Sequence, residues 1–194
     1  MTRSLDFYFD FISPYSFLAY KKLRSINQNQ KIIINYKPIL LGGLHKLGGI
    51  IAPAFNERKM KNMKNDCELV ATKNNIQFKW NERFPINSLN LMRGYLAIDI
   101  NLKNKFFDVC FDAYWKDNID ISKIENVENI LKDCEIDKNF FLKEIQNELI
   151  KIKLKELTEA AFKKDIFGAP TFIVGNKIFW GQDRLDYALE EYYS

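Results

Sequence analysis

The sequence predicts an α/β protein in which a β-α-β segment and a C-terminal β-β-α segment are separated by a long helical stretch. Three observations carry this prediction. Residues 5–12 are rich in aromatic side chains and lead directly into Ser13-Pro14, a pair typical of a helix start. Residues 54–164 carry apolar side chains at helical spacing. Residues 171–180 form two short apolar runs around Gly175-Asn176, a typical hairpin turn.

The first helix is expected to run from Ser13-Pro14 to Asn27. Serine is a favourable N-cap, and proline suits the first helical position because its missing N–H needs no partner there. A buried strand that runs straight into a helix N-terminus leaves free N–H groups and the positive end of the helix dipole at the turn. This arrangement suits an anion. The residues themselves leave open whether Ser13 belongs to such a site or is only the cap.

The remaining elements follow in chain order. Residues 31–39 are expected to form a second strand, parallel to the first because a helix connects them. Residues 40–49 are glycine-rich and are interpreted as a loop. Helices are then expected over residues 55–74, 88–98, 106–114, 127–132, 137–149 and 151–164. Gly181-Gln182-Asp183 opens a final helix after the hairpin.

Composition narrows the class of protein. The 194 residues fit one domain, or one domain with a large insertion. The net charge of +4 is mild and spread along the chain, so no nucleic-acid partner is expected. No stretch suits a membrane span or a secretory leader, so we expect a cytoplasmic protein that does not enter membranes.

The cysteine and histidine content argues against metal or dithiol chemistry. Cys67, Cys110 and Cys134 are far apart, and none lies in a C-x-x-C motif. A single histidine, His45, leaves too few ligands for a zinc site. We therefore expect no metal, interpret the cysteines as packing or surface residues, and treat His45 as incidental.

The order of the elements, with a polar group at the first strand-to-helix turn and a proline opening the hairpin, resembles the thioredoxin superfamily. It is similar to the branch with a helical domain inserted into the thioredoxin core. The resemblance implies a thioredoxin-like domain over residues 1–53 and 165–194 and an inserted all-helical domain over residues 54–164. Where disulfide oxidoreductases of that branch carry C-x-x-C, this chain has Ser13-Pro14-Tyr15-Ser16. That turn lacks the thiolate that disulfide exchange requires.

The serine version resembles the family of 2-hydroxychromene-2-carboxylate isomerases and kappa-class glutathione transferases. The segments that carry this resemblance span nearly the whole chain: residues 9–16, residues 38–43 with Lys46, residues 84–88, residues 167–172 and residues 179–184. The run Phe179-Trp180-Gly181-Gln182-Asp183-Arg184-Leu185 favours the isomerase branch.

This resemblance implies glutathione as a cofactor, with Ser13 as the catalytic residue that stabilises its thiolate. The implied cofactor-binding residues are Ser13, Pro14, Tyr15, Ala169, Pro170, Gln182, Asp183 and Arg184. The bond before Pro170 would be cis, which would free the Ala169 backbone to pair with the tripeptide as an added strand. Asp183 would bind the amino group of glutathione, cap the last helix, or do both.

The resemblance also implies a pocket for a small aromatic-derived carboxylate, lined by Lys46, Pro85, Ile86, Asn87 and Ser88. Lys46 would face a carboxylate, although an ordinary loop lysine is the alternative. One departure stands out: Ile50 occupies the position where the family commonly has an asparagine. Isoleucine cannot supply that side chain's hydrogen bond, which puts the exact substrate in doubt.

We therefore expect a glutathione-dependent isomerase that acts on an unsaturated 2-oxo or hemiketal carboxylate. Two alternatives stay open. One is a kappa-like transferase or peroxidase that consumes glutathione, and the other is a non-catalytic thioredoxin-like binding module. A homodimer is expected because related proteins are dimers.

Overall fold

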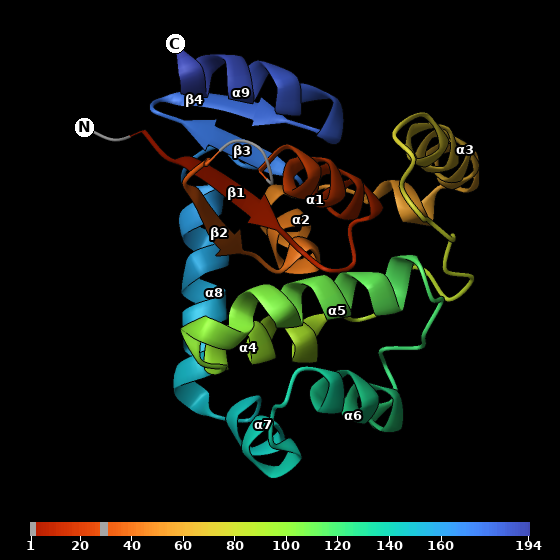
Figure 1. Cartoon of the computed structure of the whole chain (residues 1–194), viewed down its shortest axis with the longest axis vertical. Coiled ribbons are helices and arrows are strands. Elements are labelled where there is room, and N and C mark those ends of the chain that lie inside the picture. Colours follow the sequence, from red (N-terminus) through yellow and green to blue (C-terminus); the bar gives the residue numbers. More distant parts are fainter. Residues whose placement is uncertain (1–2, 28–30) are drawn as a thin grey trace.

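The computed structural model describes residues 3–27 and 31–194, and its centre is a four-stranded mixed sheet (Figure 1). Its strands are β1 (Leu5–Phe9), β2 (Ile34–Pro38), β3 (Thr171–Val174) and β4 (Lys177–Trp180), in the order β2-β1-β3-β4. β1 pairs in parallel with β2 and antiparallel with β3, and β3 pairs antiparallel with β4. The predicted β-α-β and β-β-α segments are confirmed, and they share one sheet.

Each face of the sheet is covered by helices. α1 (Pro14–Asn27) connects β1 to β2, and α9 (Leu185–Tyr193) follows the short 3₁₀ turn Gln182–Arg184. Because side chains alternate along a strand, Phe7 and Phe9 enter the main core while Tyr8 faces the other side. There Tyr8 belongs to a smaller core that also contains Leu44 of α2 (Leu41–Gly48) and Ala161 of α8 (Glu148–Phe162).

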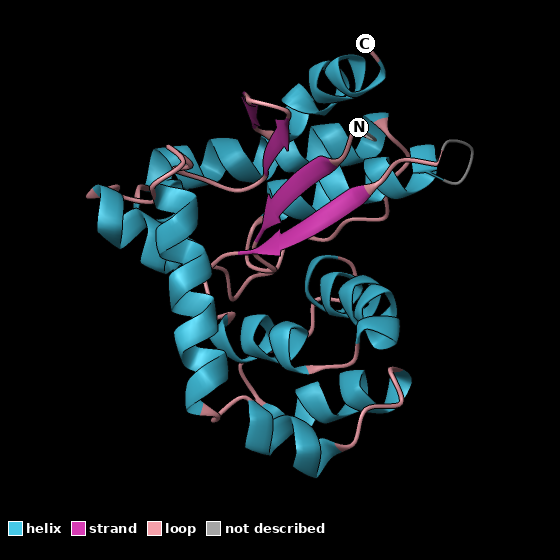
Figure 2. Ribbon diagram, turned by 90° about the vertical axis from the view of Figure 1, so that its left-hand side faces the viewer, coloured by secondary structure: helices cyan, strands magenta, loops and turns pink. Residues whose placement is uncertain are grey.

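The stretch between the two halves of the sheet is helical, as predicted. It contains α3 (Glu57–Lys73), α4 (Leu89–Ala97), α5 (Lys103–Trp115), α6 (Ile124–Asp133), α7 (Lys138–Glu144) and α8 (Glu148–Phe162), with 3₁₀ turns at Pro53–Phe55 and Ile100–Leu102. α3 lies beside α1, α4 to α7 lie on the side of the sheet opposite α9, and α8 returns to the sheet (Figures 1 and 2). The domain boundaries at residues 53/54 and 164/165 stay predictions.

Two helix assignments from the sequence were wrong. Residues 40–49 are not a loop, because α2 spans Leu41–Gly48 and Gly49 ends it at a φ of 63°. Burial of Leu44 and a hydrogen bond from the Leu41 N–H to the Asp10 carboxylate outweigh the poor helix propensity of the glycines. The predicted boundary between the helices over residues 137–149 and 151–164 is too late: α7 ends at Glu144, and α8 starts at Glu148 because the Asn147 side chain accepts from the Leu149 N–H.

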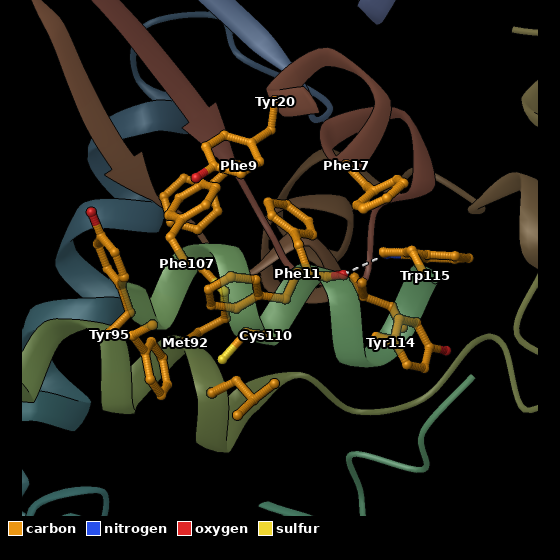
Figure 3. Packing of buried hydrophobic residues seen from close by; sticks show 14 of the residues in the cluster. Phe9, Phe11, Phe17, Tyr20, Met92, Tyr95, Phe107, Cys110, Tyr114 and Trp115 are labelled. Carbon is orange, nitrogen blue, oxygen red and sulfur yellow. Dashed lines mark hydrogen bonds between the residues drawn. The ribbon is translucent and has the colours of Figure 1, made fainter. Parts of the chain in front are cut away.

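A cluster of aromatic rings joins the sheet to the helical stretch. The ring centroids of Phe9 and Phe107 lie 4.4 Å apart, and those of Phe11 and Phe111 lie 5.0 Å apart. The indole N–H of Trp115 donates to the carbonyl oxygen of Phe11 at 2.9 Å (Figure 3). α5 therefore supports the chain directly after β1, which is where the first candidate site residues lie.

Two further observations bear on the predicted class. Cys67, Cys110 and Cys134 are free and buried, which confirms their interpretation as packing residues. Within residues 3–27 and 31–194, we find no helix with the length and apolar character needed to cross a membrane.

The close packing of α4 against α7 gives a stability prediction. A Cβ added at Gly94 would overlap the ring of Phe141, so Gly94→Ala is expected to lower the free energy of unfolding by about 1–3 kcal/mol. The matched control is Gly42→Ala in α2, where an added Cβ meets nothing within 4 Å. That variant should gain about 0.5–1 kcal/mol from helix propensity. Urea unfolding measures both, and equal effects would contradict the predicted packing.

Candidate functional site

Ser13 lies at the N-terminus of α1, almost fully buried at 3% exposure. Its hydroxyl oxygen accepts from the Ser16 N–H at 3.1 Å, so the predicted capping role is confirmed. Its hydroxyl group donates to the carbonyl oxygen of Ala169 at 2.8 Å. Ser13 therefore joins the first turn of α1 to a segment 156 residues further along the chain.

The second part of the site is the turn that leads into β3. The Ala169–Pro170 peptide bond is cis, as the resemblance implied. The Thr171 hydroxyl donates to the carbonyl oxygen of Gly168 at 2.7 Å, and the Gly181 N–H donates to the carbonyl oxygen of Pro170 at 3.0 Å. These bonds hold the segment that begins at Gly181 beside the cis-proline turn.

Asp183 lies in the 3₁₀ turn that follows. Its side chain is 59% exposed, and its carboxylate lies 3.5 Å from the Arg184 guanidinium. Neither that turn nor α9 has a side-chain cap, so the interpretation of Asp183 as a helix cap was wrong. The carboxylate is left at the surface, close enough to Tyr15 for its charge to act on the Tyr15 hydroxyl.

A groove of about 400 Å³ opens next to Tyr15. Its lining residues are Tyr15, Pro53, Arg58, Lys59, Asn62 and Met63. Two of them are cations on the first turn of α3, which gives the groove a positive side suited to carboxylates. The sequence predicted a helix over residues 55–74 but gave no indication of this groove. The one available signal was the four-residue spacing of Arg58 and Asn62, which places them on one helix face.

The Tyr15 hydroxyl is held in its protonated form. Burial raises its pKa, and the nearby Cys67, Asp66 and Asp183 raise it further. Tyr15 is therefore a hydrogen-bond donor at neutral pH and is unsuited to act as a base.

The predicted substrate residues are only partly brought together. The Asn87 side chain accepts from the Leu89 N–H at 2.9 Å, directly before α4, whose N-cap position is held by Ser88. Ser88 is buried and hydrogen bonds to the Asp10 carboxylate, which places residues 85–88 beside the first turn. Pro85 is exposed and follows a second cis bond, Phe84–Pro85, which was not predicted.

Neither Lys46 nor Ile50 lines the groove. Lys46 is exposed on α2 and is not among the residues that line the groove beside Tyr15. Ile50 is exposed just after the end of α2, and its side chain lies next to Gly48. The structure thus joins Ser13, Tyr15, the cis-proline turn and residues 181–184, with residues 85–88 adjacent to them.

Comparison with known proteins identifies the family. A family model described as a DSBA-like thioredoxin domain matches residues 4–193. The chain belongs to this family. The DSBA-like chain is 29% identical to a 2-hydroxychromene-2-carboxylate isomerase of Sphingobium xenophagum, over 99% of this chain and 98% of the relative. It is 26% identical to glutathione S-transferase kappa 1 of Rattus norvegicus, over 95% and 88% of the two chains.

A solved structure of a 2-hydroxychromene-2-carboxylate isomerase superposes on this DSBA-like protein with a TM-score of 0.87. The sequence identity is 25%, and the match covers 96% of this chain and 92% of the other. The predicted resemblance and the thioredoxin-like fold are therefore confirmed, and the isomerase relatives support an enzyme of this family.

Proposed function

We propose that the protein is a glutathione-dependent isomerase of the 2-hydroxychromene-2-carboxylate isomerase type, acting on an aromatic-derived unsaturated 2-oxo or hemiketal carboxylate. One observation carries the proposal: the hydrogen bond that joins the Ser13 hydroxyl at the tip of α1 to the Ala169 carbonyl before the cis-proline. The full-length similarity to enzymes named as such isomerases supports the choice of reaction class.

The residues around the groove fit a small peptide with mixed charges. Glutathione carries one ammonium and two carboxylate groups at neutral pH. Asp183 supplies a surface carboxylate for the ammonium group, and Arg58 and Lys59 supply cations for a carboxylate. In this proposal the backbone of Ala169 would pair with the extended peptide, as an added strand would.

When bound, glutathione would supply a thiolate that adds reversibly to the unsaturated substrate and leaves unchanged. The N-terminus of α1 favours a negative charge at that position through its free N–H groups and its dipole. Ser13 has a single hydroxyl hydrogen, so it donates either to Ala169 or to the sulfur. Its oxygen keeps the Ser16 N–H in both cases, so the cap survives this exchange.

The substrate would lie next to the first turn, on the side formed by residues 85–88. Lys46 remains proposed for a carboxylate. Arg58 and Lys59 are a second source of positive charge, nearer to Tyr15. A cytoplasmic homodimer is also part of the proposal, on the resemblance alone.

A kappa-like transferase or peroxidase is the second candidate. The similarity to glutathione S-transferase kappa 1 and the isoleucine at position 50 favour it. Both candidates would use the same thiolate, but the transferase or peroxidase would consume it.

An assay with limiting glutathione separates these functions. With 2-hydroxychromene-2-carboxylate in about 50-fold excess over glutathione, we expect many turnovers of isomerisation while total free glutathione stays constant, since the cofactor is regenerated. Ser13→Ala should slow the reaction by about 100–1,000-fold, the range for removing one donor to a developing anion. Loss of free glutathione in step with product would contradict the isomerase and favour the transferase. Absence of glutathione binding would leave only the binding module.

The role of Asp183 gives a binding prediction. Asp183→Ala should weaken glutathione binding about fivefold, or about 1 kcal/mol, because an exposed carboxylate contributes modestly to an ion pair. The matched control is Asp186→Ala, which removes an exposed carboxylate that lies 2.7 Å from Lys22. Isothermal titration calorimetry measures both affinities. Equal affinities for the two variants would remove Asp183 from the binding site.

A further inference from the structure

We propose that Asp10 is the positioning residue of this site: one buried carboxylate that fixes the β1–α1 turn, the N-terminus of α2 and residues 85–88 relative to one another. The ligands assigned to these segments rest on the proposed function, but the positioning role rests on hydrogen bonds within the chain.

Three segments converge on this one side chain. One carboxylate oxygen accepts from the Ile12 N–H at 3.1 Å, and the other accepts from the Leu41 N–H at 2.8 Å. Ser88 adds a side-chain hydrogen bond. The Asp10 carbonyl oxygen also accepts from the Ser13 N–H at 3.0 Å, so the backbone and side chain of Asp10 together shape the turn that carries Ser13.

Burial raises the pKa of Asp10, whereas its contacts with Ser88 and with the Leu41 and Ile12 N–H groups lower it and favour a carboxylate. Asp10 is fully buried, and within the described parts of the chain we find no cation paired with it. Its partners are two backbone N–H groups and one hydroxyl, and the N-terminus of α2 adds the positive end of a helix dipole. Only a carboxylate offers two acceptor oxygens, whereas the amide of asparagine would turn a donor toward one of these N–H groups.

The geometry explains why these segments act together. Residues 10–13, 41 and 88 come from distant parts of the chain. Ser13 belongs to the first of these segments, Lys46 lies on the helix that Leu41 begins, and Asn87 precedes Ser88. Removal of one partner's hydrogen bond to Asp10 releases only that partner's segment. Replacement of the carboxylate itself breaks at least one of the two hydrogen bonds from the Ile12 and Leu41 N–H groups. Displacements of about 1 Å in such a segment are costly for catalysis.

The test is Asp10→Asn, with Asp6→Asn as the matched control. Asp6 lies on β1, the strand that ends just before Asp10. It accepts from the Asn35 side chain at 2.8 Å and lies 3.8 Å from the Lys37 amine. Asp10→Asn should lower kcat/KM about 100-fold and weaken glutathione binding about fivefold. Amide hydrogen exchange at Ile12 or Leu41 should accelerate with no ligand present. Asp6→Asn should leave all three unchanged.

Two further variants separate positioning from simple loss of stability. In a Ser13→Ala background, Asp10→Asn should cause little additional loss of kcat, because the effect on the chemical step acts through Ser13. Ser88→Ala removes the contact between Asp10 and residues 85–88 but keeps the carboxylate and its two backbone hydrogen bonds. It should therefore raise the KM for the substrate while the affinity for glutathione is retained. It also serves if Asp10→Asn does not fold.

The outcomes distinguish the two proposals. If the wild-type protein binds no glutathione, the proposed function fails, and the exchange rates still decide the role of Asp10. If the wild-type protein binds glutathione, and Asp10→Asn matches Asp6→Asn in affinity, turnover and exchange, the positioning role is overturned. Fully additive losses with Ser13→Ala would also overturn it.

Discussion

The site depends on the contact between the Ser13 hydroxyl and the Ala169 carbonyl, a single hydrogen bond that connects the two halves of the thioredoxin-like fold. β1, which pairs in parallel with β2, leads into the turn that carries Ser13 at one end of the sheet. The antiparallel pairing of β1 with β3 brings the turn before Thr171 to the same end. Sheet topology therefore explains why a serine near the start of the chain meets a peptide group near its end.

The aromatic core supports the segment that carries Ser13. The Trp115 indole bonds the Phe11 carbonyl, and Phe9 and Phe11 pack against rings of α5. Asp10 lies between these two phenylalanines in the chain and directs its carboxylate to backbone N–H groups instead. Because successive side chains point to opposite sides, the rings of Phe9 and Phe11 pack in the core, while the carboxylate of Asp10 between them points the other way and shapes the turn.

Much of the fold could be predicted from local sequence patterns. The start and end of α1, the hairpin of β3 and β4, and most helices of the central stretch follow from capping residues, turn residues and apolar periodicity. α2 could not be predicted this way, because the contacts that stabilise it come from Asp10 and from packing with α8. The cis bond before Pro170 was expected only through family resemblance.

The candidate site was predictable in part. Ser13 and the cis-proline turn were found because both carry recognisable local chemistry. The groove beside Tyr15 was missed because it forms only when α3 docks next to α1, and the sequence of α3 by itself indicates a solvated helix. Asp10 belongs to a recognised segment, but its three partners become visible only after the chain has folded.

We expect the tip of α1 to stabilise a bound thiolate. The most direct test is an ultraviolet absorbance titration of the glutathione thiol bound to the wild-type protein and to Ser13→Ala. On the wild-type protein we expect a thiol pKa at least about one unit below that of free glutathione, and in the variant a pKa closer to the free value. A bound thiol that titrates like free glutathione, or identically on both proteins, would contradict this expectation.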